Sequence, residues 1–404
     1  MDLPTKTFSI LTAQLFLFLG LHASRSPNIV VIVADDLGWA DINAHDPLHR
    51  KYYETPNLDQ LTRQGVRFLQ AYANPTCTPS RAALISGQYF PNQPVYDVGD
   101  PAEGKLIAVP NTNTLPAEKV TIAEALRAKS YYSAFLGKWH IGSPGETGPL
   151  EQGFDINIGG YEAGNPGVWP GGYFQPNNNK EISDAKEGEF LTEYLTRKAE
   201  EFIIDYDKPQ PFYLHLSYFA VHVPLQAPEL LVQKYRNKTG TGGHDNPTYA
   251  AMVELLDQGV GKILEALDNA NFTDNTLVLF YSDNGGLGGY TEPEYQAEDR
   301  NVTNNAPLRS GKASFYEGGM RVPLIVRWPH VIKPNSQCNK PVIHVDIYPT
   351  LIEAAGIHET GNYKLDGESF LHFLRHPGSA SPPRNLYWHF PGYTSIGIEK
   401  GPQS

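Results

Sequence analysis

Six short apolar runs, separated by segments of helical periodicity, limit the folds that this chain can adopt. The runs span residues 28–34, 66–73, 132–137, 212–219, 277–281 and 322–328. Apolar residues recur at helical spacing in segments 122–129, 191–206, 249–267 and 347–355. This alternation predicts an α/β fold in which a large, mainly parallel or mixed sheet is sandwiched by helices. Because ligands of such sheets bind beyond the carboxyl ends of the strands, polar residues at those ends are the first candidates for a functional site.

The composition is that of a globular protein with long loops. Of the 404 residues, 40% are hydrophobic and 19% are charged, and 37 Gly and 33 Pro predict ordered loops between the regular elements. The formal charge is −12, and Lys and Arg do not cluster along the sequence. Since phosphate backbones and anionic membrane surfaces are bound by concentrated positive charge, we expect neither as a partner. An anionic small substrate would require a locally positive pocket.

Residues 1–24 resemble a secretory signal peptide. Lys6 precedes an apolar run at 8–21, and cleavage is expected near Ala23. The run is shorter than the roughly 20 residues that span a bilayer, so we expect no stable membrane insertion, although an N-terminal anchor or a buried helix would have a similar pattern. The expected location is secreted or periplasmic, or lysosomal or extracellular in a eukaryote.

Two of the expected strands end in oxygen-bearing side chains. Asp35 and Asp36 follow the first run, and Asp283 and Asn284 follow the run at 277–281. Each pair alone is typical of a turn or a helix cap. Together, four such side chains at two strand ends favour Ca²⁺ or Mg²⁺ over zinc, which more often recruits His or Cys.

Cys77 lies close to the start of an expected helix. In the segment CTPSRAALISG, Pro79 and Ser80 are expected to begin a helix that continues through Ile85. Cys77 would then directly precede a helix N-terminus, where free N–H groups favour an anion and lower the pKa of a thiol. The position alone favours a buried free cysteine or a disulfide with Cys338 over such a site.

Several motifs, in their order along the chain, resemble those of the type I sulfatases of the alkaline phosphatase superfamily. They are ADDLGW, CTPSR, GKWHIG, VHVPLQAP, YSDNGG, LRSGKASFYEGGMRVP and DIYPTL, all between residues 27 and 356. The resemblance implies an alkaline-phosphatase-like fold and arylsulfatase-like hydrolysis of sulfate esters. It further implies a catalytic domain at 25–376 and a C-terminal subdomain that starts within 377–404 and is truncated.

The resemblance also implies how the metal and the nucleophile are built. In that family the cysteine matching Cys77 is oxidised after translation to formylglycine, which leaves Cys338 unpaired. One calcium ion is bound by the modified cysteine and by the side chains at the two strand ends: Asp35, Asp36, Asp283 and Asn284. This set agrees with the oxygen ligands expected from the residues alone.

Five further catalytic residues are implied by the same resemblance. They are Arg81 in CTPSR, Lys138 and His140 in GKWHIG, His222 in VHVPLQAP and Lys312 in the SGK segment. Arg81 would hold the formylglycine, and the lysines would add positive charge at the sulfate oxygens. One hydroxyl of the hydrated aldehyde would attack sulfur while His222, alone or with Lys312, protonates the leaving alcohol. His140 would then take a proton from the second hydroxyl to release sulfate.

The implied partners are a sulfated carbohydrate as substrate and a formylglycine-generating enzyme during maturation. Two alternatives remain open from the sequence: a formylglycine-dependent phosphonate or phosphodiester hydrolase, and a non-catalytic glycan-binding relative. The aromatic loop at 159–179 could contact a sugar or could simply pack against the sheet.

Several other polar residues are expected to be structural. They are Asp41, His215, Asp257 and Asp346, the last as a helix cap. The chain departs from the family pattern at Ser310, where a glycine is usual.

Overall fold

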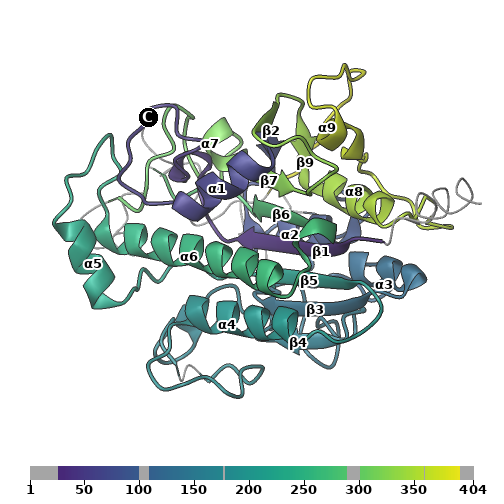
Figure 1. Ribbon diagram of the computed structural model, residues 1–404, viewed down its shortest axis with the longest axis horizontal. Coiled ribbons are helices and arrows are strands. Elements are labelled where there is room, and N and C mark those ends of the chain that lie inside the picture. Colours follow the sequence, from purple (N-terminus) through teal and green to yellow (C-terminus); the bar gives the residue numbers. More distant parts are fainter. Residues whose placement is uncertain (1–25, 100–108, 176–177, 289–300, 359, 392–404) are drawn as a thin grey trace, which may run out of the picture.

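The computed structural model describes residues 26–99, 109–175, 178–288, 301–358 and 360–391. Within these ranges nine strands form one sheet, in the order β4-β3-β5-β1-β6-β7-β2-β8, with β9 paired to β2 (Figure 1). The predicted signal peptide at 1–24 and the last residues of the predicted C-terminal subdomain, 392–404, lie outside the described residues.

The sheet is mixed, as predicted. Its strands are β1 Asn28–Ala34, β2 Val66–Tyr72, β3 Tyr132–Gly137, β4 Ile156–Ile158, β5 Phe212–Ser217, β6 Thr276–Ser282, β7 Arg321–Arg327, β8 Ser336–Cys338 and β9 Val342–Ile343. Strand β7 is antiparallel to both β6 and β2, and the other pairings are parallel.

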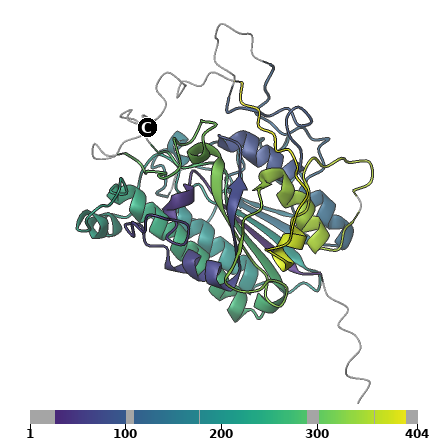
Figure 2. The same cartoon turned by 90° about the horizontal axis from the view of Figure 1, so that it is seen from above.

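Helices cover both faces of the sheet. They are α1 Pro56–Gln64, α2 Cys77–Ser86, α3 Ile122–Leu126, α4 Leu191–Ile204, α5 Glu229–Arg236, α6 Pro247–Asn269, α7 Glu317–Met320, α8 Ile347–Ala354 and α9 Leu371–Arg375. Helices α1, α4, α5 and α6 lie on one face, whereas α2, α3, α8 and α9 lie on the other (Figure 2).

Strand β1 explains why the strands are continuous apolar runs. Val30 and Ile32 face the core under α4 and α6, while Ile29 and Val31 face the core under α2 and α8. Because both faces of a central parallel strand are buried, no position on it favours a polar residue. All seven residues of β1 are buried accordingly.

The six expected strands are present with ends that differ from the prediction by at most two residues, which is normal for such boundaries. One boundary matters for function. Helix α2 begins at Cys77, two residues before the predicted start, so Cys77 is the first helical residue and does not precede the helix. Pro79 is tolerated in this first turn because the N–H that it lacks would have no partner within the helix.

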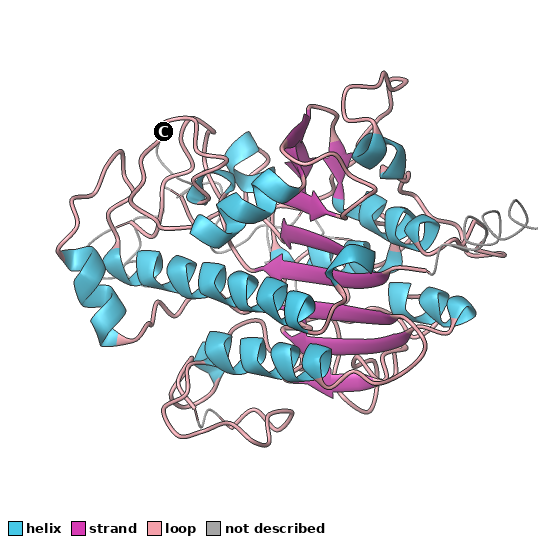
Figure 3. Cartoon of the chain, viewed as in Figure 1, coloured by secondary structure: helices cyan, strands magenta, loops and turns pink. Residues whose placement is uncertain are grey.

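The carboxyl ends of β1, β3, β5 and β6 reach the same edge of the sheet, where long loops gather (Figure 3). The oxygen-bearing side chains that follow β1 and β6 therefore lie at this edge. No helix in the described part of the chain is long and apolar enough to cross a membrane.

Candidate active site

Strands β1 and β6 place two pairs of predicted ligands side by side. Ala34 lies opposite Ser282 in the parallel register, so the residues that follow each strand meet at the sheet edge. The Asp36 backbone N–H donates to Asp283 Oδ1 at 3.2 Å, and Asn284 Nδ2 donates to Asp36 Oδ1 at 2.8 Å. All four predicted side chains, those of Asp35, Asp36, Asp283 and Asn284, are buried.

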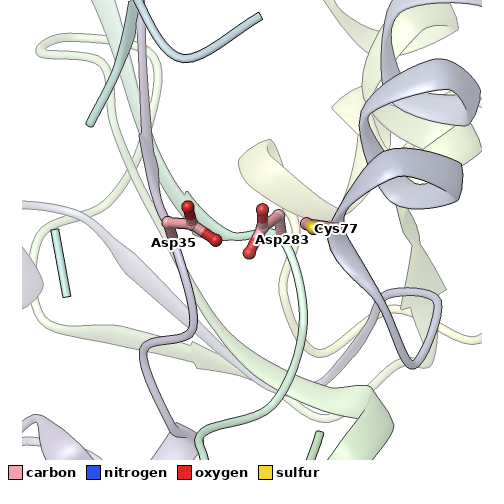
Figure 4. A group of neighbouring side chains, drawn as sticks. All are labelled: Asp35, Cys77 and Asp283. Atoms are coloured by element: carbon pink, nitrogen blue, oxygen red, sulfur yellow. The ribbon is translucent and has the colours of Figure 1, made fainter. Parts of the chain in front are cut away.

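Cys77 joins this cluster from the start of α2. Ligand atoms of Asp35, Cys77 and Asp283 lie within 4.8 Å of one another. Asp283 lies between the other two, and the Cys77 sulfur points toward its carboxylate (Figure 4). Neither Cys77 nor Cys338 forms a disulfide.

The oxygen atoms of this cluster suit a hard cation. Asp35 Oδ1 and Asn284 Oδ1 are buried, and no described protein group donates a hydrogen bond to either. Buried acceptors without a donor are costly, because they have lost water without gaining a partner. A cation that prefers oxygen ligands would satisfy both atoms.

Three buried cations surround the carboxylates. Lys138 Nζ lies 2.5 Å from Asp35 Oδ2, and Lys312 Nζ lies 2.7 Å from Asp36 Oδ1. When all three aspartates are ionised, as metal ligands are, their charges equal those of these two lysines and Arg81. A bound dication would therefore leave the site positive and ready for an anion.

Arg81 connects the helix, the metal-ligand candidates and the sheet. One turn after Cys77, its Nη2 and Nε donate to Asp283 Oδ2 at 2.7 and 2.9 Å. Its Nη1 donates to the Lys138 carbonyl at 2.8 Å and to Ser217 Oγ at 2.5 Å. The guanidinium is thus fixed in one orientation, as expected for charge-assisted bonds to a planar group.

The two neighbouring aspartates have opposite pKa shifts. Burial, followed by repulsion from Asp283, raises the pKa of Asp35 to about 8. Burial also acts to raise the pKa of Asp36, but the nearby Lys312 and then His222 hold this pKa below its ordinary value. Such a divided pair is typical of functional sites.

His140 and His222 contact different members of the cluster. His140 Nδ1 lies 3.5 Å from Cys77 Sγ, and His222 Nε2 lies 3.6 Å from Asp36 Oδ2. His222 Nδ1 donates to the Val223 carbonyl at 2.8 Å, which leaves Nε2 as the atom that faces the site. Burial and the nearby lysines lower the pKa of both rings, that of His222 to about 3, so both are neutral proton carriers.

All ten predicted site residues therefore meet at one edge of the sheet. Sequence reasoning missed Thr78, whose Oγ1 lies 3.2 and 3.3 Å from the two ring nitrogens of His140. It also missed Ser217, which accepts from Arg81. The position of Ser217 as the last residue of β5 was the available signal, because that strand ends at the same edge.

The residues expected to be structural have structural contacts. Asp41 accepts from the Gly38 N–H, His215 stacks on Phe135, and Asp257 accepts from the backbone of α1. Asp346 caps a helix as predicted, but this helix is the short 3-10 turn at 344–346, where the carboxylate accepts from the Ile343 N–H. Asp346 also precedes α8, but its carboxylate makes no cap bond to that helix and accepts instead from the Glu368 N–H and from Arg384.

The aromatic loop supports His140. The Tyr161 carbonyl accepts from the His140 N–H at 3.1 Å, and Gly164 packs directly against the imidazole. Trp169 packs edge-on against Phe219 at a centroid distance of 6.0 Å. The loop therefore does pack against the sheet, and its contact with a sugar stays a prediction.

Comparisons with known proteins identify the family to which the chain is similar. A family model described as Sulfatase matches residues 27–357. The chain is 34% identical to a sulfatase from Formosa agariphila, over 93% of the chain and 77% of that protein. It is 30% identical to mouse arylsulfatase J, over 89% of the chain but only 58% of that protein. A crystal structure of Ps i-CgsB in complex with k-i-k-neocarrahexaose has 33% identity and a TM-score of 0.69, covering 86% of this chain and 76% of that one.

Proposed function

The chain belongs to the sulfatase family, a family of sulfuric ester hydrolases, and we propose that it releases sulfate from a sulfated carbohydrate with a formylglycine made from Cys77 and one calcium ion. The observation that carries this proposal is the approach of Cys77 to two buried carboxylates within 4.8 Å. A structural cysteine gains nothing from such neighbours, whereas a nucleophile beside a metal requires them.

Calcium would be held by Asp35, Asp36, Asp283 and Asn284, together with the oxygen of the modified Cys77. When bound, it supplies positive charge that stabilises the nucleophile and the sulfate oxygens. The unpartnered oxygens of Asp35 and Asn284 support this assignment.

The chain's own cations would bind and orient the sulfate group. Lys138 and Lys312 are buried within the site, so their charges act in a medium that screens them less than water does. Arg81 keeps the end of α2 aligned with Asp283, because its donors are already fixed.

Proton transfer would fall to the two histidines. His222 Nε2 faces the site and, alone or with Lys312, would give a proton to the departing alcohol. Because Nδ1 already donates to the Val223 carbonyl, this requires the ring to take up a second proton at Nε2, which the charge of a bound sulfate group would favour. His140, 3.5 Å from Cys77 Sγ, would take the proton that must leave before sulfate is released. The lowered pKa of His140 leaves its ring neutral at physiological pH, as a base requires.

Maturation would require a formylglycine-generating enzyme that acts early. Cys77 is 2% exposed and Arg81 is 6% exposed. A modifying enzyme could not reach this segment in the folded protein, so modification would precede the completion of folding. Export by the predicted signal peptide would make the protein secreted or periplasmic, and the N-terminal sequence of the mature protein would test this.

The substrate class rests on the relatives. Ps i-CgsB was crystallised with a neocarrahexaose, and the present chain shares its fold and a third of its sequence. A panel of sulfate, phosphodiester and phosphonate esters would separate the proposal from the related hydrolase activities.

The decisive experiment combines mass spectrometry with a substitution. The peptide that contains Cys77 should carry formylglycine, and Cys77→Ala should abolish sulfate release from an aryl sulfate and from sulfated oligosaccharides. Removal of calcium with a chelator should lower both the activity and the melting temperature, because a bound ion stabilises only the folded state. Full activity of Cys77→Ala would refute the mechanism, and glycan binding by an unmodified, inactive protein would favour a non-catalytic role.

A further inference from the structure

A pocket lies close to the candidate active site. Its volume is about 380 Å³, and it is enclosed by the loop at 89–96, by Asp366 and by the segment at 387–389, with Asn74 closing one wall. None of the groups assigned above to metal binding or proton transfer lines this pocket. It is therefore a separate feature of the same region.

The walls combine aromatic rings with fixed orientations. Tyr387 is 58% exposed and contacts Tyr89 edge to face, with ring centroids 5.8 Å apart. His389 stacks on Phe90 at 4.2 Å. Aromatic faces that are already held in place bind apolar surfaces, such as the C–H face of a sugar ring, with little loss of entropy.

The polar groups of the pocket suit hydroxyls. Asp366 accepts from the Tyr89 N–H and from Asn92 Nδ2, each at 2.8 Å, so the carboxylate and the amide are held in one arrangement. His389 Nε2 is buried and has no partner among the described residues. Burial lowers the pKa of His389, so its neutral ring can exchange a hydrogen bond with a hydroxyl.

The side chains that line the pocket disfavour a sulfate group. Of the described residues that line it, none is Lys or Arg, and Asp366 contributes a carboxylate. A sulfate ester would meet this carboxylate and no cation among the lining side chains, in contrast to the site around Cys77.

Asn74 connects the pocket to the helical turn that carries Cys77. It lines the pocket, and its N–H donates to Ser80 Oγ at 2.9 Å, within the turn that carries Cys77. Asn74 is three positions before Cys77 in the chain, so their Cα atoms are at most about 11 Å apart. One carbohydrate chain could therefore reach both places.

We propose that this pocket is a subsite for an unsulfated, hydroxyl-bearing sugar ring of the same chain whose sulfate ester is hydrolysed at Cys77. The inference rests on the proposed function and adds a specificity element to it. The enzyme would select a sugar chain in which a sulfated unit has an unsulfated neighbour.

The test compares Tyr387→Ala with wild type on two substrates: a sulfated oligosaccharide that the wild type desulfates, and 4-nitrophenyl sulfate, which is too small to reach the pocket. Loss of one aromatic contact should raise KM for the oligosaccharide about three- to tenfold. Values of kcat for that substrate and all constants for the aryl sulfate should stay unchanged. Tyr387→Phe should resemble wild type, because it keeps the aromatic face.

Two further variants keep the test decisive. Asn92→Ala removes a polar contact from an exposed loop position and should also raise KM for the oligosaccharide alone. Ile204→Ala, at a residue 56% exposed and outside the pocket, should change neither substrate. Equal effects on both substrates, or no effect of either pocket variant, would overturn the subsite while leaving the proposed function intact. A wild type that hydrolyses the aryl sulfate but no sulfated sugar would overturn both the subsite and the carbohydrate assignment.

Discussion

At the scale of single residues, the site depends on side chains that orient its reactive groups. Thr78 is the clearest case, because its hydroxyl lies 3.2 Å from His140 Nδ1 and His140 in turn lies 3.5 Å from Cys77 Sγ. Thr78 is buried and adds no charge. We infer that it positions His140 and does not itself react.

Replacement of Thr78 by valine should therefore lower kcat while leaving the fold intact. Valine has nearly the same shape but lacks the hydroxyl, and loss of one such hydrogen bond should reduce kcat about three- to tenfold. Thr78→Ser should restore most of the activity. Formylglycine content must be measured in each variant, and a Thr78→Val protein with full modification and wild-type kcat would contradict the role.

The residue scale also shows where sequence reasoning reached its limit. Asp35 and Asp283 could be placed together because both directly follow buried strands, and parallel strands end at one edge. Lys312 and His222 lie in loops without periodicity, so only the family resemblance pointed to them. No local pattern could indicate that Thr78 would meet His140, because the contact joins residues 62 positions apart.

At the scale of elements, long buried strands were predictable and short ones were not. Strand β1 has seven buried residues, five of them Val or Ile, and this length and composition favour a strand over a helix. Strands β8 and β9 have three and two residues, too few to establish any period. Helix α1 was also missed, because only three of its nine residues are buried.

Two segments that carry proposed site residues meet at Gly285. A Cβ atom on this residue would lie 1.9 Å from the Gly318 carbonyl oxygen, and the Gly285 N–H donates to Gly319. This close approach brings the segment that carries Lys312 against the end of β6. A side chain at position 285 would have to push the two backbones apart.

Gly285→Ala should therefore impair both stability and activity. Overpacking against a backbone atom should cost about 1–3 kcal/mol of unfolding free energy, and displacement of Lys312 from Asp36 should lower kcat at least about tenfold. Denaturant unfolding and aryl sulfate kinetics would measure both. Gly378→Ala is the matched control, because a Cβ there meets nothing within 4 Å. Equal behaviour of the two variants would show that the contact does not hold the loops together.

Asp257 on α6 couples two helices through its carboxylate. It accepts from the N–H groups of Asn57 and Leu58 at 3.2 and 2.8 Å, at the start of α1. Burial raises its pKa to about 6 from an ordinary 3.8. Between these two values the folded protein holds a proton that the unfolded chain releases, so this group's contribution to stability is lost as the pH rises from about 4 to 6.

Asp257→Asn should remove that pH dependence. The unfolding free energy of Asp257→Asn minus that of the wild type should therefore increase by roughly 2–3 kcal/mol from pH 4 to pH 7. Urea unfolding at the two pH values would measure the gain, and Asp268→Asn, at a side chain 63% exposed, should give almost none. Parallel stability curves for wild type and Asp257→Asn would show that the carboxyl group titrates normally in the folded protein.

At the scale of the whole molecule, the charge is distributed unevenly. The chain carries a net −12, whereas Arg81, Lys138 and Lys312 are buried together in the site. With a dication bound beside these groups, an anionic substrate would meet a repulsive protein at long range and an attractive site at short range. The buried charges are shielded little by salt, whereas those at the surface are screened within about 10 Å at 0.1 M ionic strength.

Salt should consequently accelerate the capture of charged substrates. We expect kcat/KM for a sulfated oligosaccharide to rise about two- to fivefold between 10 and 150 mM NaCl, because screening weakens the long-range repulsion. The rise should be steeper for a disulfated than for a monosulfated chain of the same length, and kcat should change little. Steady-state kinetics at constant pH would measure both slopes. A fall in kcat/KM with salt would mean that the positive site, and not the acidic surface, governs the encounter.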